Sequence, residues 1–429
     1  MGKGGQKSTK SVSGPAENEI LLDGKYVDVS TFLKRHPGGN VIKFYMGNGI
    51  DATQAFGQFH VRSKKATKMI ESLPSREADM KSVEKLSLPG QRALLADFEK
   101  LTQELKDEGF FKPSPLHVFY RVSELVIMHV VGLYMLLNTH AEYQLQIACV
   151  GILLLGLGCG RCGWLMHEGG HYSLTGYIPV DRLLQIVIYG VGCGMSGGWW
   201  RNQHNKHHSM PQKADHDVDL NTLPLVAFTS KVVNKAGNAL KGWIRLQAIL
   251  FPVITTSLVA LGWQFFLHPR HILRTKNLFE FLALATRYGL WHHFITNHFG
   301  FATSAVIYFV YNWFAANYIF INFAVSHTHL PVVAKDDTQV DWVRYAAIHT
   351  MNVNPGPLRF VNWWMSYLNF QIEHHLWPSL PQFRHPEVSK RTQALFKKHG
   401  LHYDSRDYTS AIKVTFDNLD KVGYDVFYG

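Results

Sequence analysis

The chain has 429 residues, a formal net charge of +11 and 46% hydrophobic residues, so it is long enough for two or three domains. Its basic residues are scattered beside apolar segments, which suits loops that meet anionic lipid and argues against nucleic-acid binding. Its four cysteines are too few for a disulfide framework in a chain of this size, which favours a reducing, cytosol-facing protein.

The first 78 residues contain a polar tail and a small module. Residues 1–18 are rich in Gly, Ser and Lys and lack the apolar stretch of a secretory signal. They predict a disordered basic tail that stays in the cytosol. Residues 19–78 have the pattern of two short strands around an Asp23-Gly24 turn, followed by short helices. We therefore expect a compact soluble α+β domain over 19–78.

Two histidines of this module stand in short, distinctive motifs. His36 begins the tetrapeptide His-Pro-Gly-Gly, and His60 follows the segment Asp-Ala-Thr-x-x-Phe. Histidine is an axial haem ligand, and glycine lets the backbone approach a flat cofactor. The alternative is an exposed turn histidine and a helix-capping one.

Because the tetrapeptide, the spacing and the Asp-Ala-Thr segment occur together, the module resembles cytochrome b5. The resemblance implies that His36 and His60 are the axial ligands of a haem b that passes electrons and does not bind O₂. The chain before His36 is short, so the first strand and helix of that fold are expected to be trimmed.

A connector and four long apolar runs follow. Residues 79–112 predict a helical linker, because Leu94, Leu95, Phe98, Leu101 and Leu105 fall on one helical face. A helix needs about 20 apolar residues to span a bilayer, so residues 113–429 predict a membrane domain with about four transmembrane helices. The runs are 119–137, 143–166, 246–267 and 302–326, with shorter interfacial segments near 183–198 and 278–300.

The charges of one connection disagree with four simple crossings. Arg270, Arg274 and Lys276 follow the third run, where they would be lumenal, whereas basic residues favour the cytosolic side. Either this tendency is violated, or the chain from 287 to 326 contains a broken or re-entrant element. An even number of crossings leaves the charged tail after Pro381 on the side of the N-terminus.

Three histidine clusters stand beside the ends of these runs. Residues i, i+3 and i+4 share a helical face, so each cluster can direct two or three imidazoles at one point. Imidazole suits Fe, Cu, Zn and Ni, and seven histidines are too many for one ion, so the pattern predicts two ions. The clusters are His167 and His171; His204, His207 and His208; and Gln371, His374 and His375.

An eighth ligand is expected at the end of the fourth run. His327 lies nearest to the predicted membrane end, and His329 is the alternative. A single histidine pair at a membrane interface usually does no more than contact water and lipid headgroups, which is how we interpret His292-His293. Three clusters in the order HxxxH, HxxHH and QxxHH, each beside a membrane end, favour metal binding.

These clusters resemble those of the membrane fatty acid desaturases, and more narrowly of the front-end desaturases fused to cytochrome b5. The distinguishing residue is Gln371, at the position where other branches have a histidine. Segments such as GWLMHEGGHYSLTG and WWRNQHNKHH are similar to algal, protist and invertebrate enzymes. The resemblance implies a mostly α fold, with the histidines and Gln371 as the catalytic set around two iron ions.

The same resemblance implies the reaction and its setting. The enzyme would use O₂ to insert a cis double bond, Δ6 or Δ5, between the carboxyl group and an existing double bond of a polyunsaturated chain. The substrate would be an acyl-CoA or a phospholipid in the membrane, with electrons from an NADH-dependent cytochrome b5 reductase. The protein would be a multi-pass protein of the endoplasmic reticulum with both termini and the clusters in the cytosol.

Further residues are expected around the irons. Glu168, Asp217, Asp219, Asn205 and Glu373 are placed to orient the imidazoles. Gln371 is expected to hydrogen-bond through water or to bind iron weakly. A narrow tunnel would set the position of the double bond, with a lining that includes Trp199, Trp200, Trp363 and Trp364.

Other patterns point to functions that we reject or leave open. Residues 158–163 match both GxGxxG and CxxC, but they end an apolar helix and follow no strand. Close helix packing explains the glycines better than nucleotide or zinc binding does. The alternatives are a desaturase of sphingolipid long-chain bases, a hydroxylase, and a non-catalytic electron carrier. Product analysis separates the first two from acyl desaturation, and the intact clusters oppose the third.

Overall fold

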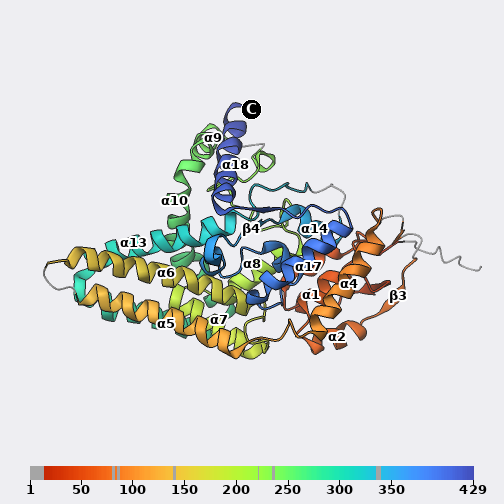
Figure 1. Cartoon of the computed structure of the whole chain (residues 1–429), viewed down its shortest axis with the longest axis horizontal. Coiled ribbons are helices and arrows are strands. Elements are labelled where there is room, and N and C mark those ends of the chain that lie inside the picture. The colour runs from red at the N-terminus through yellow and green to blue at the C-terminus, as the bar shows by residue number, and fades with distance from the viewer. Residues whose placement is uncertain are drawn as a thin grey trace, which may run out of the picture.

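The computed structural model describes residues 14–79, 83–84, 87–138, 142–220, 222–233, 237–334 and 340–429. Residues 1–13 of the predicted tail lie outside this range. The chain is mostly helical, as predicted, with a small sheet near its N-terminus (Figure 1). A bundle of long helices extends to one side, and the N-terminal domain lies at its other end.

The N-terminal domain is a three-stranded antiparallel sheet with short helices. β1 (Glu19–Leu22) and β2 (Lys25–Asp28) are joined by the predicted turn, where Gly24 has a φ of 73° that glycine adopts without strain. β3 (Ser75–Glu77) pairs with β2. Between β2 and β3 lie η1 (Leu33–Arg35), η2 (Gly39–Tyr45), α1 (Thr53–Phe59) and α2 (Lys64–Glu71).

The linker helix α4 (Gln91–Asp107) is amphipathic, as predicted. Its buried face packs against α14 (Trp342–His349) and α17 (His385–Lys398). Phe98 stacks on Trp377 with ring centroids 5.1 Å apart. The linker therefore packs together with α14 and α17 in the part of the protein that covers one end of the bundle, which we call the cap.

Among the described residues, four helical stretches are long and apolar enough to cross a membrane, and they cover the four predicted runs except for one or two end residues of three of them. The first two are α5 (Pro115–Leu137) and α6 (Gln144–Gly170). The third joins α10 (Gln247–Ser257), the π-helical η4 (Leu258–Leu267) and α11 (His268–Thr275). The fourth joins α12 (Leu278–Trp291), η5 (His292–Thr296) and α13 (Asn297–Ala324). Between the second and third, α7 (Ile178–Cys193) and α8 (Gly197–Ser209) form a pair bent by 108°.

Glycines of α6 bring it close to its neighbours. A Cβ atom on Gly151 would lie 2.7 Å from the carbonyl oxygen of Gly132 in α5, and one on Gly160 would overlap the ring of Tyr318 in α13. Gly160 belongs to the GxGxxG match. These glycines therefore serve helix packing, as predicted, and the four cysteines of the chain are free thiols.

The fourth stretch reverses its direction at Gly300, where φ is 74° and ψ is 168°. Trp291 Nε1 donates to Ser304 Oγ (2.9 Å), and Arg287 donates to the hydroxyl of Tyr311 (2.7 Å). Residues on the two sides of Gly300 thus face each other, so α12 and α13 run in opposite directions. The segment 278–300, expected at the interface, is the first arm of this hairpin.

The remaining segments complete the cap. The C-terminal helix α18 and α9 project beside α10 (Figure 1). A short parallel pair, β4 with β5, joins two cap segments. The elements are η3 (Ser230–Val232), α9 (Asn238–Arg245), β4 (Asn352–Val353), η6 (Pro357–Arg359), α15 (Phe360–Trp364), α16 (Gln371–Leu376), η7 (Gln382–Arg384), β5 (Ser405–Arg406) and α18 (Tyr408–Tyr428).

The N-terminal domain is docked on the cap. The Tyr45 hydroxyl donates to the carbonyl of Ser209 (3.1 Å), and the Ser379 hydroxyl donates to the carbonyl of Gln58 (2.9 Å). Met210 and Tyr345 of the later chain complete the apolar core of the small domain. A shared core supports a domain that is too small to bury much surface alone.

Candidate metal centre and haem pocket

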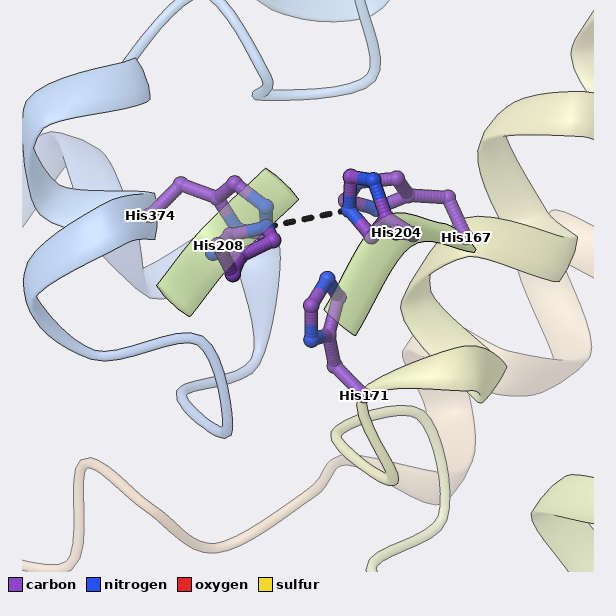
Figure 2. Close-up of side chains that lie close together, drawn as sticks. All are labelled: His167, His171, His204, His208 and His374. Atoms are coloured by element: carbon purple, nitrogen blue, oxygen red, sulfur yellow. Dashed lines mark hydrogen bonds between the residues drawn. The ribbon is translucent and has the colours of Figure 1, made fainter. Parts of the chain in front are cut away.

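The eight predicted histidines come together at the cap end of the bundle. Figure 2 shows five of them around one space, contributed by α6, α8 and α16. The ligand atoms of these five all lie within 4.8 Å of one another. The group, called group A here, consists of His167, His171, His204, His208 and His374.

A second group adjoins the first. His207, His327 and His375 also have ligand atoms within 4.8 Å of one another, and they form group B. The rings of His208 and His375 stack with centroids 4.1 Å apart, so the two groups share a border. His327 therefore lies in a group, whereas His329 lies outside both. This arrangement favours the first choice for the eighth ligand.

The donor atoms of both groups suit bound metal. The Nε2 atoms of His167 and His171 and both ring nitrogens of His374 and His375 are buried without a hydrogen-bond partner. An unsatisfied buried polar atom costs about 1–3 kcal/mol, so a ligand is expected to complete the site. Burial lowers the pKa of His171 to about 3, which keeps the imidazole in its neutral, metal-binding form.

Group B has oriented outer contacts. Both carboxylate oxygens of Asp217 lie 3.1 Å from Nδ1 of His207. Burial disfavours the imidazolium of His207, but the carboxylates of Asp217 and Asp219 raise its pKa to about 9. Nδ1 of His327 donates to the carbonyl of His349 (3.1 Å), so Nε2 is the atom turned toward the group. Such contacts fix the orientation of the imidazole ring, as metal binding requires.

The other predicted orienting residues have different roles. Glu168 accepts from the backbone N–H of Gln382 (3.1 Å), and the amide of Gln382 contacts Nδ1 of His167 (2.9 Å). Glu373 holds Asn352 and Tyr403, and Asn205 lines the haem cavity described below. Only Asp217 and Asp219 of the predicted set therefore contact a histidine of the two groups directly in the described structure.

Gln371 is buried and lies within hydrogen-bonding reach of His327. It thus occupies the border of group B. Of the four predicted tunnel tryptophans, Trp200 stacks on His204 with centroids 4.2 Å apart. The other three lie elsewhere: Trp199 packs on His268, Trp363 donates to Glu124, and Trp364 donates to Tyr408.

Sequence reasoning did not identify two residues beside group A. Gln382 touches His167, and His385 is fully buried with its Nε2 unpartnered and its ring 6.0 Å from that of His374. Both belong to the segment Pro-Gln-Phe-Arg-His-Pro shortly after the third cluster. The sequence shows only that this polar segment lies close to the third cluster. That the segment is buried, which marks it as part of the site, is seen only in the structure.

His36 and His60 face each other across a cavity of about 900 Å³. Their ring centroids are 6.3 Å apart, about the span of two metal–nitrogen bonds of ~2 Å with half a ring on each side. Nδ1 of His36 contacts the carbonyl of Gly39 (3.2 Å), and Nδ1 of His60 contacts that of Phe56 (2.9 Å). Both Nε2 atoms are left for a metal. Burial lowers the pKa of each ring.

The walls of this cavity suit a flat aromatic cofactor. Apolar walls come from Phe32, Val41, Ile42, Phe56 and Phe59. A Cβ atom on Gly38 would lie 2.8 Å from the His36 ring, so the glycine leaves room for that ring. The residues therefore fit a haem with two histidine ligands.

Comparison with known proteins finds relatives for both the histidine-cluster domain and the small N-terminal domain. The family described as fatty acid desaturase matches residues 145–407, and the cytochrome b5-like haem/steroid binding domain matches residues 11–79. The chain is 52% identical over 409 residues to the acyl-lipid (8-3)-desaturase of Rebecca salina, covering 95% of this chain and 92% of the relative. It is 44% identical over 441 residues to the acyl-lipid (8-3)-desaturase of a Thraustochytrium species, covering 99% and 98%. The Delta(8)-fatty-acid desaturase of Euglena gracilis is 31% identical, covering 92% of each chain.

Proposed function

Since the chain belongs to the fatty acid desaturase family and carries a cytochrome b5-like domain, we propose that it is a front-end acyl-lipid desaturase with two irons in groups A and B. It inserts a cis double bond between the carboxyl group and an existing double bond of a polyunsaturated chain. The observation that carries this proposal is the convergence of eight histidines, seven buried and one half-buried, in two adjoining groups.

The names of two relatives favour one position for the new bond. Both are acyl-lipid (8-3)-desaturases. We take these numbers to mean a new bond three carbons to the carboxyl side of an existing bond at carbon 8, which is carbon 5. Of the two positions expected from the sequence, we therefore propose Δ5, and we propose a lipid-bound acyl chain over acyl-CoA as the substrate.

The chain's own residues prepare the site for this reaction. Bound iron supplies the O₂ and one-electron chemistry that side chains lack and that removal of hydrogen from an unactivated methylene requires. Asp217 and the carbonyl of His349 hold the Nδ1 atoms of His207 and His327, so the Nε2 atoms face group B. Trp200 covers His204 on one side. Burial of seven of the eight histidines limits the access of water to the site.

The small domain is placed to deliver electrons. Phe59 precedes the haem ligand His60, lines the haem cavity, and has its ring 6.4 Å from that of His208 in group A. His171, also of group A, lines the same cavity. We propose that His36 and His60 hold a haem b, which would supply one-electron transfer between an NADH-dependent cytochrome b5 reductase and group A over this short distance.

We infer four crossings, made by α5, α6, α12 with η5, and α13. The third apolar stretch contacts the C-terminal helix α18 at one end and the start of the histidine-bearing helix α8 at the other. Gln247 donates to the carbonyl of Leu419 in the cap (2.8 Å), and His268 Nδ1 accepts from the backbone N–H of Ser196 at the start of α8 (2.8 Å). In Figure 1, α10 runs across the direction of α6 and α13.

The start of α12 supports the same assignment. Glu280 accepts from the backbone N–H of Gly198 (2.7 Å), so α12 leaves from the histidine end. Arg270, Arg274 and Lys276 then lie on the histidine side, which satisfies the preference of basic residues for the cytosol. We propose that both termini and the histidines face the cytosol, with the protein in the endoplasmic reticulum.

Product analysis tests the proposed reaction. The chain is expressed in yeast that lacks polyunsaturated lipids, and C18 and C20 polyunsaturated acids are supplied singly. We expect a C20 acid with a bond at carbon 8 to gain one at carbon 5, located by mass spectrometry in phospholipid. A hydroxylated product, or altered long-chain bases with unchanged fatty acids, would contradict the assignment.

Two variants separate the sites in this assay. His375→Ala removes a ligand of group B and should abolish the product while the haem spectrum remains. His36→Ala removes a haem ligand and should abolish the product while non-haem iron remains. Normal product formation by either variant would refute the role given to that site.

A further inference from the structure

The haem cavity is enclosed by two domains. One wall belongs to the small domain, with His36 and His60. Another wall comes from the membrane domain and its cap, and it includes Tyr172 after α6, Arg182 of α7, and Arg201 and Asn205 of α8. The small domain alone therefore forms only part of this cavity.

The charge of the lining has one sign. Among the described residues that line the cavity, six are basic and none is acidic. They are Arg35, Arg62, Lys64, Lys65, Arg182 and Arg201. A second cavity between the domains, about 460 Å³, has Asp51 and Asp341 in its lining beside two lysines. A pocket with cations alone selects an anionic ligand.

Haem is anionic at its edge, because its two propionate groups are carboxylates at neutral pH. Arg62 is already occupied, since it donates to the backbone carbonyls of Phe111 and Ser379. The two arginines of the membrane domain have neutral partners instead. Arg182 donates to the Tyr172 hydroxyl (3.2 Å), and Arg201 donates to the side-chain oxygen of Gln185 (2.6 Å).

Both arginines keep further donors. A guanidinium has five N–H groups in a planar fork that matches a carboxylate, and each of these bonds uses one of them. Arg201 is half-buried at the cavity wall, where a charge-assisted hydrogen bond is stronger than in open water. The wall opposite the small domain thus offers carboxylate-binding groups that the chain itself does not use.

We propose that Arg182 and Arg201 bind the propionate groups of the haem, so that the membrane domain completes the haem site. This inference rests on the haem binding proposed above and adds the residues that hold its carboxylates. The bound haem then bridges the two domains and is held beside His171. Retention of haem and docking of the small domain depend on each other.

Haem retention in the full-length protein tests this inference. Arg182→Gln, Arg201→Gln and the double variant are purified in lipid nanodiscs, with Arg274→Gln as a charge-matched control on the exposed surface of α11. The first measurement is the rate of haem transfer to excess apomyoglobin. The second is the haem midpoint potential, obtained from absorbance during a redox titration.

We expect the transfer rate to rise about tenfold in each single variant, since one charge-assisted hydrogen bond is lost, and further in the double variant. The midpoint potential should fall, because removal of a positive charge favours the oxidised haem. Arg201→Lys keeps the charge and should retain most of the potential, and Arg274→Gln should match the wild type in both measurements.

The inference is refuted if the double variant has the transfer rate and potential of the wild type, or if Arg274→Gln changes them equally. These results leave the proposed function intact, because the wild-type protein still shows the spectrum of a haem with two histidine ligands. Absence of that spectrum from the wild-type protein would refute the haem assignment itself.

Discussion

Asp217→Asn tests the outer support of group B. The carboxylate of Asp217 is fully buried, and both of its oxygens lie 3.1 Å from Nδ1 of His207. Asparagine has nearly the same shape but lacks the charge, and it replaces one acceptor by a donor. Loss of such a partner lowers metal affinity about 10–100-fold, or about 1.4–2.7 kcal/mol. We therefore expect iron to be lost from group B in this variant.

The assay compares iron with haem in the same sample. Protein is purified under reducing conditions without chelator, non-haem iron is measured per haem, and its release to an added chelator is followed over time. Asp219→Asn is the matched control, because Asp219 lies 3.2 Å from the same ring nitrogen but its side chain is 60% exposed. Water and salt screen an exposed carboxylate, so its loss should change the affinity less.

Equal iron content and equal release rates in Asp217→Asn and the wild type would refute this reasoning. So would a larger loss in Asp219→Asn than in Asp217→Asn. Either result would mean that the buried carboxylate does not support a metal ligand.

Three further substitutions test other contacts. Glu124→Gln leaves the buried Arg161 without its carboxylate partner at 2.7 Å. Because breaking a buried ion pair costs about 3–5 kcal/mol, we expect a lower Tm, measured in detergent by intrinsic fluorescence. Phe59→Ala empties the space between the haem cavity and His208, so reduced haem should be reoxidised more slowly by O₂ and substrate in stopped-flow absorbance. Tyr45→Phe removes one interdomain hydrogen bond worth about 1 kcal/mol, so limited trypsin should cut between the domains faster.

Conservative variants and negative results complete these tests. Phe59→Tyr keeps the ring and should keep the reoxidation rate, and an equal rate in Phe59→Ala would show that the ring has no part in electron transfer. An unchanged Tm in Glu124→Gln would mean that the buried ion pair adds no stability. Cleavage of Tyr45→Phe at the wild-type rate would mean that its hydrogen bond does not hold the domains together.

The sequence by itself determined the local features of this protein. Helical spacing predicts which histidines share a face, and apolar length predicts the long helices, since both depend only on neighbours along the chain. His36 and His60 were predicted in the same way, from a short motif and its surroundings. The structure brings the eight histidines of the clusters into two adjoining groups and leaves His36 and His60 with ring centroids 6.3 Å apart.

Only the tertiary structure decided how the histidines are divided. His207 and His208 are adjacent, yet they belong to groups B and A, and His374 and His375 are divided in the opposite order. Consecutive residues of a helix point about 100° apart, so neighbours can point into different groups. Which group each joins depends on how α8 and α16 pack, and these helices are far apart in the sequence.

The same reason applies to the contacts around the sites. Gln382 at His167 and Arg201 at the haem cavity come from segments distant from the residues that they support. The reversal at Gly300 is likewise accompanied by contacts between its two arms, such as that of Trp291 with Ser304. Sequence patterns report what a segment prefers alone, whereas these features arise from contacts between segments, which only the folded chain brings together.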